Sequence, residues 1–267
     1  MSPVDLSYST EGDGALVVLL HGFPEFRYSW RKQVPALAAA GFQVVTPDLR
    51  GYNLSPKPRD IASYQLTNIV DDVAALIDRL GGAPCILVGH DWGGLVAWYV
   101  AMTRPGLVRK LAILNIPHPV PLSRELHRSR DQKFRLAYQL FLSLPIIPEL
   151  FMKLFGGALL RRAGKFSNEE VKVYQHAWKG SMRTMLHYYR AVQRFRGKLR
   201  ELVKRIDIPV LLIWGEEEKV FIRETTEDFA EWVPDLRIER IPGAGHFVQT
   251  DAPERVNELL LRFMKQA

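Results

Sequence analysis

The chain is poor in cysteine: Cys85 is the only one among 267 residues. A single cysteine excludes an intramolecular disulfide framework, and its place inside an apolar run indicates a core residue. No Cys/His cluster has metal-ligand spacing, and no glycine-rich nucleotide-binding motif occurs. No apolar run reaches the ~20 residues that span a bilayer, and residues 1–10 lack a signal-peptide pattern. We therefore expect a cytoplasmic protein that needs no metal and no cofactor.

Composition is that of an ordinary globular protein, with 47% hydrophobic and 24% charged residues. The length fits one large domain or a domain that carries an insertion. The net charge of +7 is unevenly placed, because residues 118–205 hold 19 Lys and Arg against 6 Asp and Glu. This segment forms either a solvated face of helices or a surface for an anionic partner. Because no nucleic-acid-binding module accompanies the charge, we expect no nucleic-acid partner. We also expect at most weak contact with membrane surfaces, and a monomer or a homodimer.

Short apolar runs alternate with segments of helical periodicity. This order predicts an α/β fold with a mostly parallel sheet flanked by helices on both faces. A first strand near residues 4–9 is also expected, though its pattern is weaker. The strand-like runs are 15–20, 42–45, 85–88, 111–114, 210–214 and 236–241, and the helical segments are 30–40, 66–80, 95–102, 225–232 and 253–264.

The alternation stops between about residues 118 and 205. This stretch has no strand-like run of its own, and prolines at 117, 119, 121, 145 and 148 precede or interrupt its helical segments. We expect an inserted helical cap at 118–205 that covers the carboxyl ends of the strands, where open α/β sheets bind ligands. Residues 1–117 and 206–267 would then form the core domain.

Asp91 occupies the most informative position of the chain. It lies within Gly-His-Asp-Trp-Gly-Gly at 89–94, between an apolar run and a helical segment. This is the pattern of a strand-to-helix elbow that carries a nucleophile, with aspartate where esterases have serine. A carboxylate attacks a saturated carbon and forms an ester with it. The flanking strand and helix favour the nucleophile over a loop with packing glycines.

An acid and a histidine are expected to follow such a nucleophile along the chain. Glu218 ends a run of three glutamates after the strand-like run 210–214, and His246 stands in a glycine-rich loop after the last one. Glu216 and Glu217 are the alternatives for the acid. The remaining histidines are more typical of packing or surface positions.

The sequence resembles the epoxide hydrolases of the α/β-hydrolase superfamily over nearly its whole length. The matching motifs are His-Gly-Phe-Pro-Glu at 21–25, Asp-Leu-Arg-Gly-Tyr at 48–52, Gly-His-Asp-Trp-Gly-Gly at 89–94 and Gly-His-Phe at 245–247. The resemblance implies an oxyanion hole formed by the backbone N–H groups of Phe23 and Trp92. Pro24 has no N–H, so Phe23 is the last donor before it.

The resemblance also implies two cap tyrosines that hold the epoxide oxygen. The matching positions are Tyr138 and Tyr189, with Tyr188 as the alternative to the second. A phenol donates a hydrogen bond and supplies a proton as the alkoxide forms. The expected substrate-binding residues are Phe23, Pro24, Trp92, Tyr138, Tyr189 and Phe247.

The sequence departs from the family pattern at the acid and at one turn residue. Glu218 stands where relatives commonly have aspartate, but a longer carboxylate can still orient an imidazole. Asn115 occupies an acid position that some relatives use, and its lack of charge leaves this role to Glu218. Asn53 replaces a common glycine and is expected to be tolerated, because asparagine accepts left-handed backbone geometry.

These features predict an epoxide hydrolase that converts an apolar epoxide and water to a vicinal diol through an ester on Asp91. The apolar segment 140–155 favours aryl or alkyl epoxides over charged ones. One alternative is a haloalkane dehalogenase with the same nucleophile, although such enzymes usually place a polar residue where Phe23 stands. The other is a non-catalytic ligand receptor on the same fold, which would have no use for all of these residues together.

Overall fold

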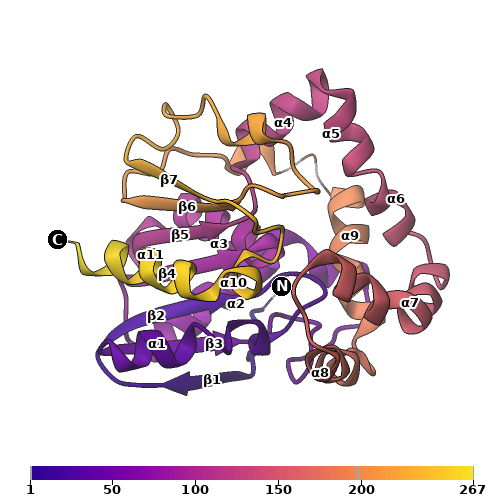
Figure 1. Cartoon of the computed structure of the whole chain (residues 1–267), viewed down its shortest axis with the longest axis horizontal. Coiled ribbons are helices and arrows are strands. Elements are labelled where there is room, and N and C mark those ends of the chain that lie inside the picture. Colours follow the sequence, from indigo (N-terminus) through magenta and orange to yellow (C-terminus); the bar gives the residue numbers. More distant parts are fainter. Residues whose placement is uncertain (1, 196, 198, 267) are drawn as a thin grey trace.

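The computed structural model describes residues 2–195, 197 and 199–266. Residues 1, 196, 198 and 267, which fall within the predicted domain ranges, lie outside the described part. Figure 1 shows a central sheet with helices on its two faces and a group of helices beside it. The architecture is the α/β fold that the alternation of apolar runs predicts.

Within the described residues the sheet has seven strands in the order β1-β3-β2-β4-β5-β6-β7. β1 pairs antiparallel with β3, and every other neighbouring pair is parallel. All six predicted strand-like runs form strands, and the weak first strand forms a few residues later than expected. The strands are β1 (Tyr8–Glu11), β2 (Ala15–Leu20), β3 (Phe42–Pro47), β4 (Cys85–His90), β5 (Val108–Leu114), β6 (Val210–Gly215) and β7 (Leu236–Ile241).

Helices cover both faces of this sheet. Leu16, Val18 and Leu20 of β2 pack into the core layer shared with α2 and α3. Val17 and Leu19 face the opposite layer, with residues of α1 and α11. Successive side chains of a strand point to opposite faces, so a strand buried on both is apolar throughout. The core helices are α1 (Val34–Ala39), α2 (Leu66–Leu80), α3 (Asp91–Thr103), α10 (Val248–Asp251) and α11 (Pro253–Lys265), with 3-10 turns η1 (Arg27–Trp30), η2 (Ile61–Tyr64), η3 (Pro105–Leu107), η5 (Arg200–Leu202) and η6 (Arg223–Thr226).

The predicted helix at 225–232 is wrong. Only the short turn η6 forms there, and Asp228 has a φ of 54° that a regular helix excludes. The Arg124 guanidinium donates hydrogen bonds to the carbonyls of Glu224, Glu227 and Asp228. In a regular helix these carbonyls would accept from backbone N–H groups of the helix itself. The predicted helix at 30–40 is interrupted as well, since η1 and α1 share that segment.

A helical insert at 119–195 stands over one edge of the sheet, on the right in Figure 1. The prediction of a helical cap is confirmed in kind, while its outer limits at 118 and 205 stay a prediction. Among the described residues no single helix is long and apolar enough to cross a bilayer, although 130–142 and 147–163, bent by 112°, pass that test as a pair. The insert consists of α4 (Pro119–Arg128), α5 (Arg130–Arg135), α6 (Tyr138–Leu142), α7 (Ile147–Ala163), α8 (Asn168–Trp178) and α9 (Met182–Phe195).

Buried hydrogen bonds fix this insert to the core. Nε1 of Trp178 on α8 donates to the carbonyl of Pro24 at 2.6 Å. The hydroxyl of Tyr188 on α9 donates to the carbonyl of Arg50 at 2.9 Å. Both acceptors lie in loops after strands of the sheet, so the cap is held against the carboxyl ends of those strands.

Candidate active site

Asp91 sits at the turn between β4 and α3 with a φ of 48°. A non-glycine residue in the left-handed region is uncommon, and the surrounding backbone must hold it there. The glycines do so by close approach: a Cβ on Gly89 would lie 2.5 Å from the carbonyl oxygen of Gly93, and one on Gly93 would lie 2.3 Å from that of Leu20. The elbow predicted from the sequence is therefore the one that forms.

The Asp91 carboxylate is nearly buried and has backbone donors beside it. The N–H of Phe23 donates to Oδ1 at 2.8 Å. Trp92 is the second residue of α3, so its N–H belongs to the free amides at the helix N-terminus, which favour negative charge. Burial alone would raise the pKa of Asp91, but the hydrogen bond and charge of His246 and the Phe23 amide hold it below its usual value. The side chain is thus kept ionised.

His246 lies between two carboxylates. Its Nδ1 is 2.7 Å from Oε2 of Glu218, and its Nε2 is 3.5 Å from Oδ2 of Asp91. Burial acts to lower the pKa of His246, but the charge of Glu218 and the contact with Asp91 outweigh it and raise that pKa well above the usual value. The imidazole can therefore hold a proton while both carboxylates are ionised.

Glu218 is the carboxylate that the fold brings to the histidine, and Glu216 and Glu217 are exposed. Asn115 donates to Oε2 of Glu218 at 2.6 Å, and the N–H of Val220 donates to Oε1 at 2.6 Å. Burial opposes ionisation of Glu218, but His246 and these donors hold its pKa below the usual value. The asparagine at the alternative acid position therefore orients the Glu218 carboxylate.

Tyr138 and Tyr189 face the same space as Asp91. Both line one cavity with the carboxylate, and their rings meet edge-on with centroids 6.4 Å apart. Burial raises the pKa of both hydroxyls, and the charge of Asp91 raises them further. The two phenols thus stay protonated across the ordinary pH range and are available as donors.

Tyr188, the alternative to Tyr189, lies elsewhere. It is fully buried, and its hydroxyl is committed to the Arg50 carbonyl. Successive residues of a helix point about 100° apart, so two neighbours on α9 cannot both face the cavity. The geometry therefore favours Tyr189 for the second hydroxyl.

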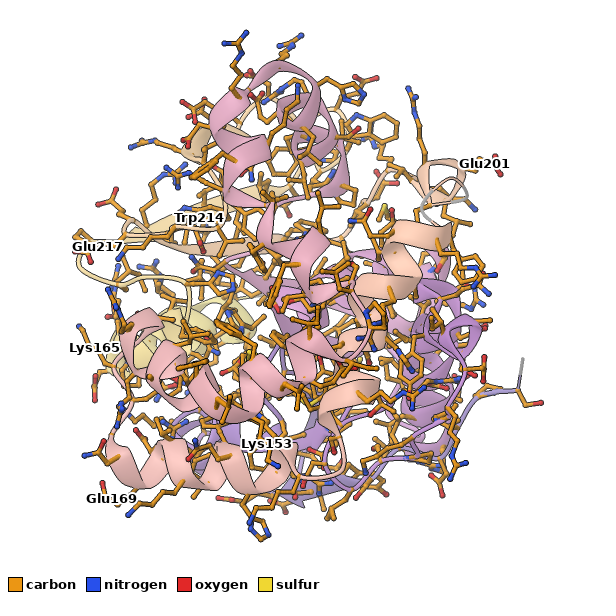
Figure 2. The ribbon with its side chains drawn as sticks, turned by 90° about the vertical axis from the view of Figure 1, so that its right-hand side faces the viewer. Lys153, Lys165, Glu169, Glu201, Trp214 and Glu217 are labelled. Carbon is orange, nitrogen blue, oxygen red and sulfur yellow. The ribbon has the colours of Figure 1, made fainter. Side chains whose placement is uncertain are left out.

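The cavity has a volume of about 880 Å³ and lies between the core and the cap. Asp91 and His246 stand at its core side, and cap side chains form a mostly apolar wall. The other charged residues of the lining include Lys165 and Glu217, which lie toward the same edge in Figure 2. The cap residues of the wall include Phe141, Leu142, Phe151, Met152, Leu159 and Leu160.

The other predicted substrate-binding residues have different positions. Phe23, Pro24 and Phe247 line the cavity. The ring of Trp92 packs edge-on against Tyr189 at 5.2 Å between centroids and supports that tyrosine from the core side. Direct contact of the Trp92 side chain with a substrate stays a prediction.

A buried polar network under the site was missed by sequence reasoning. His90 Nδ1 lies 2.8 Å from Oε2 of Glu25, and Nε2 of His90 lies 2.8 Å from the carbonyl of His246. Gln249 donates to Oε1 of Glu25 at 3.1 Å. Glu25 and His90 both stand in the quoted motifs, but the sequence does not reveal that they meet. This network ties the loop of His246 to the strand that ends in the elbow.

The chain is similar in sequence and in structure to known proteins over most of its length. Residues 15–253 match the model of the alpha/beta hydrolase fold family. The AB hydrolase superfamily protein YfhM of Bacillus subtilis (strain 168) is 38% identical, over 95% of this chain and 91% of its own. Epoxide hydrolase 2 of Caenorhabditis elegans is 32% identical, over 98% of this chain and 78% of its own. A crystal structure of a variant Bacillus megaterium epoxide hydrolase, complexed with its product, a naphthyloxy-propanediol, has a TM-score of 0.90 and 31% identity, covering 98% of this chain and 99% of that one.

Proposed function

Because the chain belongs to the alpha/beta hydrolase fold family and is similar to epoxide hydrolases over its full length, we propose that it hydrolyses epoxides to vicinal diols. One observation carries the proposal: Tyr138, Tyr189 and the nearly buried carboxylate of Asp91 line the same cavity. An epoxide needs a nucleophile at carbon and a proton donor at oxygen. This arrangement supplies both at once.

In the first step the Asp91 oxygen that the Phe23 amide does not hold attacks an epoxide carbon. A carbon–oxygen bond to the carboxylate forms as the ring carbon–oxygen bond breaks. The ring oxygen is bound by Tyr138 and Tyr189 and takes a proton from one of them. The product of this step is a hydroxyalkyl ester on Asp91, and nothing leaves the enzyme.

In the second step His246 takes a proton from a water molecule that attacks the carbonyl carbon of the ester. Forming the ester removes the negative charge of Asp91, which is one of the two charges that raise the pKa of His246. The imidazole therefore becomes easier to deprotonate when a base is needed. The amides of Phe23 and Trp92 stabilise the oxyanion. As the intermediate collapses, its bond to the diol oxygen breaks, and that oxygen takes the proton of the new carboxylic acid, which leaves Asp91 ionised again. The proton held by His246 returns to the tyrosinate formed in the first step, and the diol is released.

The residues that form the wall of the cavity favour apolar substrates over charged ones. Most of its cap residues are aliphatic or aromatic, so an aryl or long alkyl group is desolvated there against apolar side chains; the cap cations in the lining are Arg162 and Lys165. A volume of about 880 Å³ exceeds what a small epoxide alone fills. Epoxides with a bulky apolar substituent therefore suit this cavity better than small or charged ones.

A substrate panel tests the proposal. It contains aryl epoxides, long-chain alkyl epoxides and haloalkanes, and it is scored for diol and for halide release. We expect diol formation that is lost in an Asp91→Ala variant. Halide release without diol formation would identify a dehalogenase. Binding of epoxides without turnover would identify a receptor.

A further inference from the structure

The outer face of the cap exposes an unusual number of large hydrophobic side chains. Of those exposed among the described residues, all but Tyr8 and Leu54 lie in the cap. Nine of them belong to α6, α7 and their connection. Tyr138 and Leu159 line the cavity, and we name the other seven the cap apolar face. Its members are Leu140, Leu144, Ile146, Ile147, Leu150, Leu154 and Phe155.

Helix α7 lacks the polar outer face that a surface helix usually has. Met152, Gly156 and Leu160 point inward and line the cavity. Leu150 and Leu154, spaced four residues apart, point outward and are 55% and 72% exposed. When a helix has apolar residues on two sides and only one side is buried, the exposed apolar side is typical of a surface that binds another molecule.

The turn before α7 gives a second, independent observation. Ile146 has φ 67° and ψ −50°, and the N–H of Ile147 donates to the carbonyl of Pro145 at 2.7 Å. This is a tight γ-turn of the rare, strained kind, in a region that β-branched residues avoid. Its result is that two isoleucines are directed to solvent, with Ile146 68% exposed. Strain that presents apolar side chains to water indicates a functional surface.

The excess of positive charge around the cap apolar face favours an anionic partner. Residues 133–165 hold six Lys and Arg, of which Arg135 is paired with Asp131 at 3.0 Å, and one acidic residue, Glu149, which Arg190 binds at 2.8 Å. Lys153 lies among the apolar residues of α7, in the midst of the cap side in Figure 2. A second copy docked here by twofold symmetry would bring these cations against one another. Anionic headgroups above an apolar layer would complement both the cations and the leucines.

We infer that the cap apolar face docks on the surface of anionic phospholipid membranes. In this arrangement α7 lies along the interface, its outward leucines enter the acyl boundary, and Lys153 extends toward the headgroups. The inner side of the same helix forms the wall of the cavity, so docking brings that wall against the lipid. The docking does not depend on the reaction, and a catalytically inactive protein is expected to bind in the same way.

Vesicle flotation tests the inference with full-length protein and vesicles of phosphatidylcholine alone or mixed with phosphatidylglycerol. We expect binding to the anionic vesicles that weakens as salt is raised, because exposed charges are screened. The Leu150→Gln/Leu154→Gln variant should lose at least tenfold in partitioning, whereas Leu54→Gln, an equally exposed leucine of the core, should behave as wild type. Lys153→Gln should lose about fivefold, and the matched Lys265→Gln should lose little.

Three results would overturn it. One is negligible flotation with both kinds of vesicle. Another is an equal loss in the Leu54→Gln control. The third is a dimer in sedimentation experiments without lipid that disappears in the double-leucine variant, since the face would then belong to a second copy.

An Asp91→Ala variant that floats as wild type separates this test from the proposed hydrolysis. Should the double-leucine variant fold poorly, the salt dependence of Lys153→Gln decides the matter.

Discussion

Nε2 of His246 lies 3.5 Å from Oδ2 of Asp91, on the side of the imidazole opposite its 2.7 Å contact with Glu218. The resting histidine thus faces two negative charges, and the proposed first step neutralises one of them. The pKa of the base therefore depends on the state of the nucleophile.

The two half-reactions should respond differently to pH. Ester formation needs ionised Asp91, whose pKa is held low, and protonated tyrosines, whose pKa values are raised. It should therefore be insensitive to pH from about 5 to 8. Ester hydrolysis needs neutral His246, and the neutral form is lost as pH falls through its pKa. The fraction of enzyme present as ester, measured by acid quench and mass spectrometry, should rise as pH falls. An ester fraction that rises with pH would contradict this assignment.

Replacing either Tyr138 or Tyr189 by phenylalanine should slow ester formation by about tenfold or more, because one donor to the departing oxygen is lost. The double variant should be nearly inactive. Single-turnover rates measure the effect directly. If the double variant keeps more than about a tenth of the wild-type rate, the tyrosine pair is not the oxygen-binding group.

Tyr188→Phe is the matched control for these variants. Its hydroxyl is buried against the Arg50 carbonyl, so its removal should cost about 1 kcal/mol of stability and leave ester formation little changed. A larger effect on ester formation than that of Tyr189→Phe would move the second role to Tyr188.

Changing Glu218 to glutamine should slow ester hydrolysis far more than ester formation, by about 10²-fold or more. The substitution removes the charge that raises the pKa of His246 and the acceptor that orients its Nδ1. Pre-steady-state rates of the two steps measure the difference. Glu216→Gln is the control, because that side chain is exposed. A control as slow as the Glu218 variant would require a different acid.

Much of the site could be predicted from the sequence because its parts are local. The elbow around Asp91 is recognisable from small residues beside a nucleophile, since a Cβ at Gly89 or Gly93 would meet backbone. The histidine and acid follow because the carboxyl ends of parallel strands lie along one edge of the sheet. Only burial separates Glu218 from its two neighbours, and burial of one among three adjacent glutamates leaves no periodic signal.

Features that depend on contacts between distant segments could not be predicted. The segment 225–232 has the pattern of a helix. Its helix does not form, and Arg124, about 100 residues earlier, donates hydrogen bonds to the carbonyls of Glu224 and Glu227. Glu25 meets His90 from 65 residues away. The apolar residues of α7 are spread over more than one side of the helix, and the sequence alone could not tell which of them the core would cover.

Removing the Glu25 carboxylate should destabilise the protein as well as the site. Glu25→Ala leaves buried His90 and Gln249 without a shared acceptor, which should cost about 2–4 kcal/mol in urea unfolding. Because His90 holds the carbonyl of His246, ester hydrolysis should slow more than ester formation. Glu231→Ala, at an exposed position, should change neither. A purely structural role for Glu25 would lower stability while both rates stayed the same.

A His246→Gln variant isolates the intermediate. Asp91 is already ionised and needs no base for its attack, so this variant should consume about one equivalent of epoxide and then stop. Intact-protein mass spectrometry should show a gain equal to the whole epoxide, because ring opening expels nothing. A haloalkane substrate would instead add its alkyl group without the halogen. Peptide mapping should place the adduct on Asp91, and Asp91→Ala should form none. Free turnover by the His246 variant, or an adduct on another residue, would rule out the two-step mechanism.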